Sequence, residues 1–264
     1  MLLIRHLCSN QFYTIVILKK SLGQHFLKDE NIINNIVLAV KEHPFTQLLE
    51  VGPGGGALTK HLLAIPNIDF KAVELDDEKV VLLPKSLPNI QGKIIHKDFL
   101  QIDAPFEGHF TIIGNFPYNI STEILFKAID WKDQVDVVIG MFQKEVAQRV
   151  AAPAGSKVYG VISVLIQAFY NVEYLFDVPP TSFTPPPKVM SGVIRLTRAA
   201  EPLAVKSERS FKILVKTAFN QRRKMLRNAV KSLFDDTVLA EEIFNKRAEQ
   251  LTKEDFALLS FRMK

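Results

Sequence analysis

Several features that would place this protein in other classes are missing from its 264 residues. The only cysteine is Cys8, so an intramolecular disulfide is excluded, and we expect a cytoplasmic protein in a reducing compartment. No apolar run approaches the roughly 20 residues that a membrane-spanning helix needs, so we expect no membrane partner. The six histidines are scattered without the spacing of metal ligands, and we expect no metal.

The first residues resemble a signal peptide without being one. A short apolar stretch, Phe12 to Leu18, follows Arg5, but Lys19 and Lys20 come next in place of a small-residue cleavage site. We interpret residues 1–18 as a leader without a functional role, or as the result of a misassigned start codon.

The net charge of +5 is unevenly distributed. The segment from Lys206 to Lys231 has nine basic residues and one acidic residue, so it carries +8 while the remainder carries −3. Five of these basic residues recur at a spacing that places them on one side of a single helix. They are Arg209, Lys212, Lys216, Arg223 and Arg227. Such a concentration of one sign favours a polyanionic partner, the phosphate backbone of a nucleic acid.

The first half of the chain alternates between short apolar runs and helical stretches. The runs that read as buried strands are residues 47–51, 70–75, 94–98, 110–113 and 135–139, and residues 57–63 read as a helix. This alternation predicts an α/β fold with an open, doubly wound, mostly parallel sheet. Ligands of such sheets bind at the carboxyl ends of the strands.

Residues suited to binding a nucleoside follow three of these strands. Gly52 and Gly54 let the backbone approach a ligand closely. Glu74, 22 residues after Gly52, is placed to accept hydrogen bonds from ribose hydroxyls, and Asp98 could accept one from an adenine amino group. A nicotinamide dinucleotide would use similar groups, but the loop at 52–56 is Gly-Pro-Gly-Gly-Gly and lacks the G-x-G-x-x-G spacing.

The fourth strand leads into Asn115-Phe116-Pro117-Tyr118, which suits methylation of an exocyclic amine. The adenine N6 amine is a poor nucleophile because its lone pair is delocalised into the ring. The side-chain oxygen of Asn115 and a backbone carbonyl beside Pro117 would hold both N–H groups and localise the lone pair, while Tyr118 would stack on the base. S-adenosylmethionine, which has adenine and ribose but no phosphate, is the ligand that fits all four strand ends.

Several motifs, in order from about Lys19 to Asn228, resemble those of one enzyme family. The stretches that carry the resemblance are KSLGQHFL at 20–27, EVGPGGGALT at 50–59, NFPYNIST at 115–122, SFTPPPKV at 182–189 and FNQRRK at 219–224. Together they are similar to the KsgA (RsmA) small-subunit ribosomal RNA adenine dimethyltransferases, whose Rossmann-like sheet is of the class I methyltransferase type. Phe116 replaces the commoner leucine of that family, and the position of His25 is often asparagine.

The resemblance implies both an activity and a set of contacts. The expected reaction is dimethylation of two adjacent adenosines near the 3′ end of 16S rRNA, within an immature 30S subunit, by a monomer. The residues implied to contact S-adenosylmethionine are His25, Leu27, Gly52, Gly54, Glu74, Asp98 and Asn115. The residues implied in catalysis are Asn115, Pro117 and Tyr118.

We expect the amine to displace the sulfonium methyl directly, in line, with proximity and orientation supplying most of the catalysis. No general base is indicated. Phe183 either covers the second face of the adenine or is a core aromatic on the strand that leads to Pro185.

The composition divides the chain into a methyltransferase domain at 19–198, a linker at 199–205 and a basic helical domain at 206–264. The RNA contacts are expected in the helical domain, at Arg222, Arg223, Lys224 and Arg227.

Three alternatives remain open from the sequence. The erythromycin-resistance methyltransferases share the loop at 115–118 but modify large-subunit rRNA. A mainly non-catalytic role in ribosome assembly would use the same folds and surfaces. A dinucleotide oxidoreductase would bind its cofactor at the same strand ends.

Overall fold

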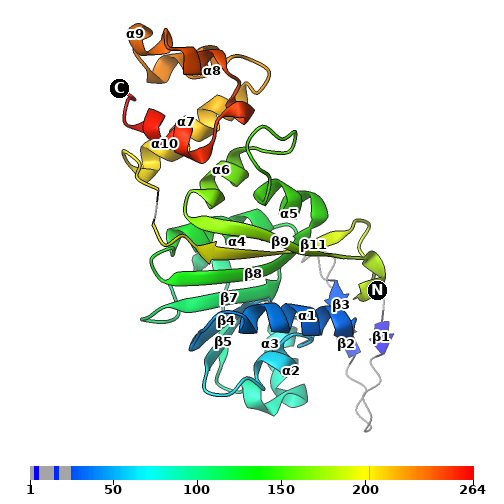
Figure 1. Ribbon diagram of the computed structural model, residues 1–264. Helices are drawn as coiled ribbons and strands as arrows, with labels where there is room; N and C mark the ends of the chain where they lie inside the picture. Colours follow the sequence, from blue (N-terminus) through cyan, green and yellow to red (C-terminus); the bar gives the residue numbers. More distant parts are fainter. Residues whose placement is uncertain (1–2, 6–14, 18–24, 202) are drawn as a thin grey trace. The chain divides into compact units, whose positions relative to one another are not determined.

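The computed structural model describes residues 3–5, 15–17, 25–201 and 203–264 (Figure 1). Most of the expected leader, and residues 20–24 of the first motif, lie outside these ranges. Within the leader, β1 (Leu3–Arg5) pairs antiparallel with β2 (Ile15–Ile17).

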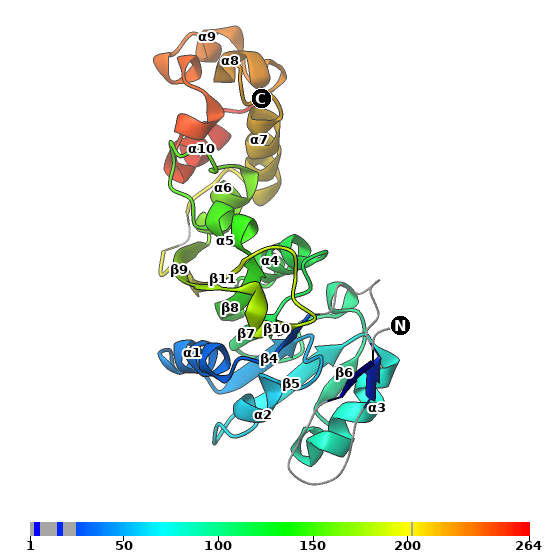
Figure 2. The ribbon, with the colours of Figure 1, turned by 90° about the vertical axis from the view of Figure 1, so that its right-hand side faces the viewer.

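The central element is a seven-stranded sheet with the order β6-β5-β4-β7-β8-β11-β9. Its strands are β4 (Gln47–Val51), β5 (Asp69–Glu74), β6 (Ile94–His96), β7 (Phe110–Asn115), β8 (Val135–Gln143), β9 (Tyr170–Val178) and β11 (Ser191–Arg198). The pairs β4–β5, β5–β6, β4–β7 and β7–β8 are parallel, which confirms the predicted doubly wound α/β class. Figure 2 shows β6, β5 and β4 side by side.

The strand order reverses between β4 and β7. Chain order runs outward from β4 through β5 to β6, and then returns to place β7 on the other side of β4. At such a reversal the loops after the two strands diverge to opposite faces and leave a crevice at their carboxyl ends. The strand order therefore places a crevice suited to ligand binding next to Val51 and Asn115.

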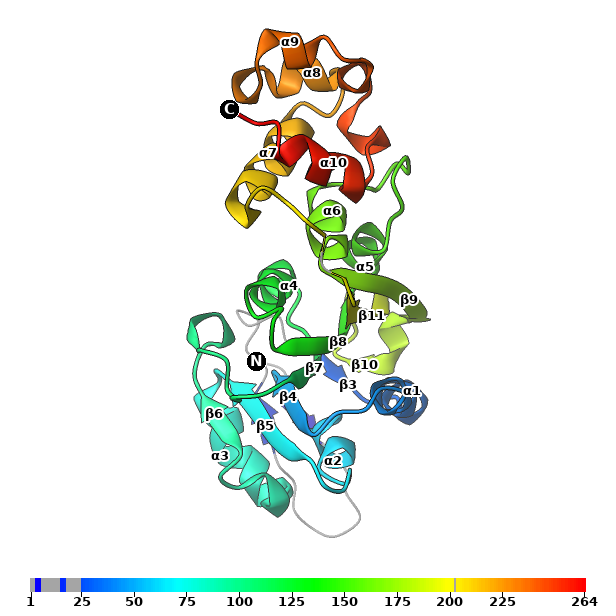
Figure 3. The ribbon, with the colours of Figure 1, turned by 60° about the vertical axis from the view of Figure 1, so that its left-hand side comes forward.

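Helices cover both faces of this sheet. They are α1 (Glu30–Lys41), α2 (Thr59–Leu62), α3 (Asp77–Ser86) and α4 (Ser121–Asp130). One core cluster joins buried residues of α1, α2 and α3 to one face of the strands, including Ile36, Leu62 and Leu83. Figure 3 shows α1 and α4 on opposite sides of the sheet.

The chain forms two compact units. The first comprises Met1–Lys144 and Leu175–Arg195, and the second comprises Glu145–Tyr174 and Leu196–Lys264. The linker expected at 199–205 is irregular, but it falls inside the second unit, which also takes in residues from before β9. The chain crosses between the units after Lys144, Tyr174 and Arg195, and each crossing lies within a regular element (α5, Lys144–Val150, β9 and β11), where composition gives no boundary signal.

The second unit is helical. It contains α6 (Val161–Gln167), α7 (Glu208–Asn220), α8 (Leu226–Ala229), α9 (Asp236–Leu239) and α10 (Lys253–Ser260), and α5 (Lys144–Val150) lies at its first boundary. The apolar side of α7, which includes Phe211 and Leu214, is buried. Phe219 is in ring contact with Tyr159 and Phe256.

The expectation of one continuous basic helix is wrong beyond Asn220. The backbone leaves the helical conformation at Gln221 (φ −121°, ψ 50°), so Arg223 lies in a turn and Arg227 in α8. The amide of Leu226 donates to the carbonyl of Lys246, 2.8 Å away, instead of continuing α7. Surface charge spacing did not reveal this end, because exposed positions constrain the backbone weakly.

Candidate functional site

A cavity lies at the carboxyl ends of β4, β5, β6 and β7, where the strand order reverses. All nine residues predicted for the cofactor and for catalysis line it. They are His25, Leu27, Gly52, Gly54, Glu74, Asp98, Asn115, Pro117 and Tyr118. The structure thus brings together residues spread over more than 90 positions of sequence, and their individual roles remain predictions.

The glycine-rich loop after β4 forms one wall of the cavity. Gly52 and Gly54 have φ angles of +71° and +55°, in the left-handed region that glycine adopts without strain. The ring of Phe26 lies against the same loop, since a Cβ on Gly55 would be 3.3 Å from its Cδ1 atom. The backbone conformation favours glycine at positions 52 and 54, and the Phe26 ring leaves little space for a side chain at position 55.

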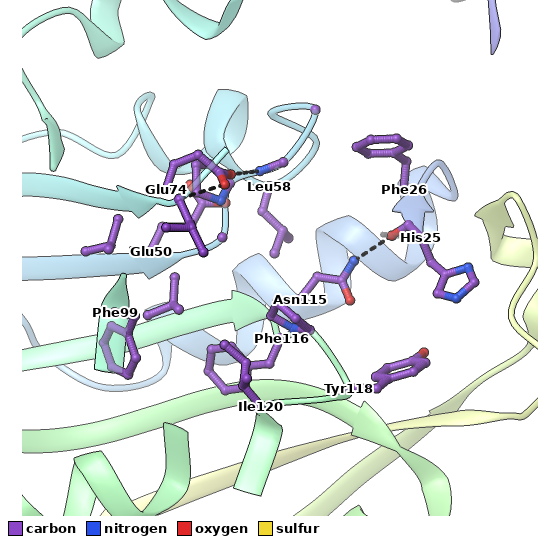
Figure 4. A pocket seen from close by; sticks show the side chains of 18 of the residues that line it. His25, Phe26, Glu50, Leu58, Glu74, Phe99, Asn115, Phe116, Tyr118 and Ile120 are labelled. Carbon is purple, nitrogen blue, oxygen red and sulfur yellow. Dashed lines mark hydrogen bonds between the residues drawn. The ribbon is translucent and has the colours of Figure 1, made fainter. Parts of the chain in front are cut away.

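Glu74 ends β5 with its carboxylate held by backbone amides. Its Oε1 atom accepts hydrogen bonds from the amides of Leu75 and Asp76, both at 2.9 Å, and its Oε2 atom accepts one from the amide of Gly54 at 3.2 Å. Figure 4 shows this carboxylate between the loop and the end of β5. The side chain joins the glycine loop to β5 and retains acceptor capacity toward the cavity, because each carboxylate oxygen can accept two hydrogen bonds.

Asp98 is the second predicted carboxylate. It follows β6, where its Oδ1 atom accepts a hydrogen bond from the amide of Leu100 at 2.9 Å and its Oδ2 atom accepts one from Gln101 Nε2 at 3.3 Å. These bonds hold the Asp98 side chain at the carboxyl end of β6, where it lines the cavity.

Glu50 is an acid in the cavity wall that the sequence reading did not assign to the site. It lies within β4, is 1% exposed, and its Oε2 atom has no hydrogen-bond partner within the described part of the chain. Burial, with a smaller contribution from the charge of nearby Glu74, raises the pKa of Glu50 to about 8. A charged residue inside the apolar run Leu48–Val51 was the signal that could have revealed it.

Asn115 is oriented by the N-terminal motif. Its Nδ2 atom donates to the carbonyl oxygen of His25, 3.0 Å away, and its Oδ1 atom has no recorded hydrogen bond to the part of the chain that the structure describes (Figure 4). His25 is itself fixed by a hydrogen bond of 2.9 Å between Nδ1 and the carbonyl oxygen of Pro185. The described segment around His25 therefore determines which way the amide of Asn115 faces.

Tyr118 stands beside His25, with ring centroids 5.9 Å apart (Figure 4). Its hydroxyl is hydrogen-bonded to Ser191 Oγ at 2.5 Å. Burial raises the pKa of Tyr118 above its ordinary value of 10, and the bond to Ser191 offsets part of that effect. The hydrogen bond to Ser191 therefore holds the outer end of the ring, and the raised pKa keeps the phenol neutral.

Phe183 is a core residue in this structure. It is 1% exposed, belongs to the main apolar cluster and pairs with Leu27 between β10 (Phe183–Thr184) and β3 (Phe26–Leu27). It does not line the cavity. Of the two placements expected for Phe183, the structure therefore shows the core position. A contact between Phe183 and the adenine does not fit that position.

The four residues expected to contact RNA all lie in the second unit and fall into two groups. Arg222 donates to the carbonyl of Lys157 at 2.5 Å and pairs with Glu249 at 3.6 Å, and Arg227 donates to Asn245. Arg223 and Lys224 are exposed. Arg222 and Arg227 therefore hold the second unit together, and the other two side chains project into solvent.

Phe26 at the cavity and the lysine that contacts its ring were also missed in the sequence. Phe26 lines the cavity, and the Nζ atom of the buried Lys79 lies 4.4 Å from the centre of its ring. A cation–π contact of this kind joins α3 to β3. No local pattern indicated it, because the two residues are far apart in the sequence.

Within residues 25–201 and 203–264, and the two short strands before them, no group of three histidine, cysteine or acidic side chains is placed to hold a metal ion. In the same described part, no helix is both long and apolar enough to cross a membrane.

Glu50 predicts a dependence of stability on pH. Folded Glu50 keeps its proton to about pH 8, whereas the unfolded carboxyl loses it near 4.5, so the wild type loses free energy of unfolding as the pH rises between these values. We expect Glu50→Gln, which cannot ionise, to become more stable than the wild type by a few kcal/mol between pH 5 and pH 8 in urea unfolding. Glu107→Gln, at an exposed position, is the control. An identical pH profile for Glu50→Gln and the wild type would contradict the assignment.

Comparison with known proteins agrees with this geometry. Residues 16–263 match the model of the ribosomal RNA adenine dimethylase family. The chain is 50% identical to the ribosomal RNA small subunit methyltransferase A of Cytophaga hutchinsonii, over 90% of this chain and 94% of that one, and 50% identical to that of Parabacteroides distasonis, over 92% of each.

Among solved structures, a dimethyladenosine transferase from Plasmodium falciparum matches with a TM-score of 0.74 at 24% identity, over 90% of this chain and 97% of that one. The 23S rRNA methyltransferase ErmE matches with a TM-score of 0.67 at 22% identity, over 89% and 99%. These two likenesses show a shared class I methyltransferase fold and do not separate the two rRNA targets. The family match and the sequence relatives extend over nearly the whole chain, and the chain therefore belongs to the ribosomal RNA adenine dimethylase family.

Proposed function

We propose that this protein dimethylates the N6 amines of two adjacent adenosines near the 3′ end of 16S rRNA, with S-adenosylmethionine as the methyl donor and an immature 30S subunit as the substrate. The observation that carries the proposal is the orientation of Asn115. Its amide nitrogen is bound to the carbonyl of His25 at the cavity, so its oxygen is the group left to accept an N–H of the base.

The charge of the cavity supports S-adenosylmethionine over a dinucleotide. Apart from His25, the ionisable side chains that line it are Glu50, Glu74, Asp98, Lys97 and Tyr118, so acids outnumber the single lysine. The donor is a sulfonium with an ammonium group and no phosphate, whereas a dinucleotide brings two negative phosphates. In addition, the amide of Gly54, which could otherwise bind a phosphate, already donates to Glu74. Family membership points the same way.

The unpaired oxygen of Glu50 also fits a cationic ligand. A buried carboxyl with one unpaired oxygen is costly when ionised, and a cation in the cavity would favour its ionised form. Glu74 and Asp98 would hold the ribose and the adenine of the donor, and the glycine loop would let its backbone lie close. When bound, S-adenosylmethionine supplies an electrophilic methyl group on sulfur.

The protein's own groups then bind and orient the base. Asn115 Oδ1 and a backbone carbonyl beside Pro117 accept the two N–H groups, which localises the amine lone pair. Tyr118 stacks on the ring and stays protonated, because burial raises its pKa, so it does not serve as a base. The methylated nitrogen would carry a positive charge that makes its N–H acidic, so it would lose that proton to water, and catalysis by orientation of this kind requires no general base.

The exposed basic residues of the second unit supply a surface for phosphates. Arg209, Lys212 and Lys216 are exposed on α7, and Arg223 and Lys224 are exposed in the turn that follows. We assign the phosphate contacts to this surface, with Arg222 and Arg227 maintaining its shape through their internal bonds.

The decisive experiment supplies labelled S-adenosylmethionine to the purified protein with under-methylated 30S particles, 50S particles and naked 16S rRNA in parallel. We expect dimethyladenosine at two adjacent positions on the 30S particles alone, mapped by primer extension and mass spectrometry. Label on 50S particles would assign the protein to the erythromycin-resistance activity. Binding of S-adenosylmethionine and of 30S particles without label would favour the assembly role.

The stacking role of Tyr118 predicts a difference between two variants. Tyr118→Ala removes the ring and should lower kcat/KM on 30S particles by roughly 10- to 100-fold, the range of one base–aromatic stack. Tyr118→Phe keeps the ring and loses only the bond to Ser191, so we expect most of the activity to remain. Equal losses in the two variants would contradict a stacking role and favour a role for the hydroxyl.

The phosphate surface predicts a change in salt dependence. Replacing Arg223 and Lys224 by alanine should weaken RNA binding and reduce the slope of log affinity against log salt by about 1.4 to 1.8, for two lost phosphate contacts. Replacing Lys41 and Lys85, which are exposed in the first unit, is the matched control. A fall in affinity with an unchanged slope would rule out direct phosphate contacts at these positions.

A further inference from the structure

Phe116 lies between two residues assigned to the reaction, yet it does not face solvent. Its side chain is 1% exposed, and its ring packs edge-on against Phe142, with centroids 5.2 Å apart and planes at 73°. Asn115 precedes it at the end of β7 and Pro117 follows it. The position of this ring therefore constrains the backbone on both sides of it.

The ring occupies space that two missing side chains leave open. Gly114 of β7 and Gly140 of β8 are register partners, directly opposite each other in the parallel pair. Because side chains alternate along a strand, Phe116 and Phe142 project to the same face as these glycines. Each glycine thus lies two positions before one of the two aromatic residues, on the same face of the sheet.

Neither glycine could carry a side chain in this arrangement. A Cβ on Gly140 would lie 2.2 Å from Phe116 Cε2 and 2.6 Å from Phe142 Cε2. A Cβ on Gly114 would lie 2.7 Å from Phe116 Cε1 and 2.6 Å from the carbonyl oxygen of Val51. No positive φ is recorded at either position, so glycine is required here by space and not by backbone conformation.

We propose that Gly114 and Gly140 form a seat for the Phe116 ring, and that Gly140 is a positioning residue for methyl transfer. It acts through Phe116 on Asn115, Pro117 and Tyr118, and touches none of the reacting atoms. The inference rests on the proposed function, because Gly140 can position groups for methyl transfer only if the protein performs that reaction.

Displacement of the Phe116 ring would also move the neighbouring groups assigned to catalysis. Asn115 is held by one hydrogen bond of 3.0 Å to His25, and Pro117 lies close to the glycine loop, since a Cβ on Gly52 would be 3.8 Å from its Cδ atom. A ring pushed away by a new Cβ must move the chain that carries it. Misplacement of a reacting group by about 1 Å can cost on the order of 100-fold in rate.

A mutant cycle tests the seat. Gly140→Ala should lower kcat on 30S particles by roughly tenfold or more, because the new methyl group displaces Phe116. Phe116→Leu removes the ring atoms that the methyl group meets. In the Phe116→Leu background, the penalty of Gly140→Ala should therefore shrink to roughly threefold or less.

Two further variants separate the seat from general packing. Phe142→Leu removes the other ring that meets the methyl group, and it should relieve the loss of kcat less than Phe116→Leu does. Gly160→Ala is the control for adding a methyl group, because Gly160 has an extended backbone and nothing lies within 4 Å of its missing Cβ. We expect it to leave kcat unchanged.

The outcomes are distinct. A penalty for Gly140→Ala that Phe116→Leu relieves, and Phe142→Leu relieves less, supports the seat. No penalty, or the same penalty in all three backgrounds, overturns it.

If the wild type methylates no rRNA substrate, the proposed function fails instead, and the seat is then tested by the midpoints of thermal unfolding. Those midpoints should show the same coupling between Gly140 and Phe116, and additive midpoints would overturn the seat.

Discussion

The close approach of β4 and β7 at their carboxyl ends is the constraint on which the site depends. These strands are neighbours where the sheet order reverses, and the carbonyl of Val51 leaves no room for a Cβ at position 114. Because the strands are this close, the glycine loop after β4 and the Asn115–Tyr118 loop after β7 face each other across one cavity. The two walls proposed to bind the cofactor and the base thus come from two adjacent strand ends.

The polar groups of the cavity are held in place mainly by backbone atoms. Glu74 accepts from three amides, Asp98 accepts from the amide of Leu100, and Asn115 donates to the carbonyl of His25. Such bonds fix the orientation of each side chain before a ligand arrives, which is the preparation that catalysis by orientation requires. Glu50 is the exception: it is buried without a partner for one oxygen, and its raised pKa reflects that arrangement.

Tertiary contacts override the local sequence pattern at several particular residues. Phe183 had two possible placements, and burial against the apolar cluster selected the core. The charge spacing from Arg209 to Arg227 predicted one helix, but Leu226 bonds to Lys246 and the helix ends at Asn220. The strand β9 and the helix α6 were not predicted, and both belong wholly or partly to the second unit, whose first segment precedes the expected linker.

The fold class, the family and nine of the residues that line the cavity could be predicted from the sequence alone, because apolar periodicity and contiguous motifs are local properties of the chain. Packing in the folded protein determines that the Nδ2 donor of Asn115 is bound to His25, that Arg222 and Arg227 are occupied by internal bonds, and that the ring of Phe116 lies against Gly114 and Gly140. These facts depend on atoms that approach within a few ångströms from distant positions, and such distances are set by packing and not by any single segment.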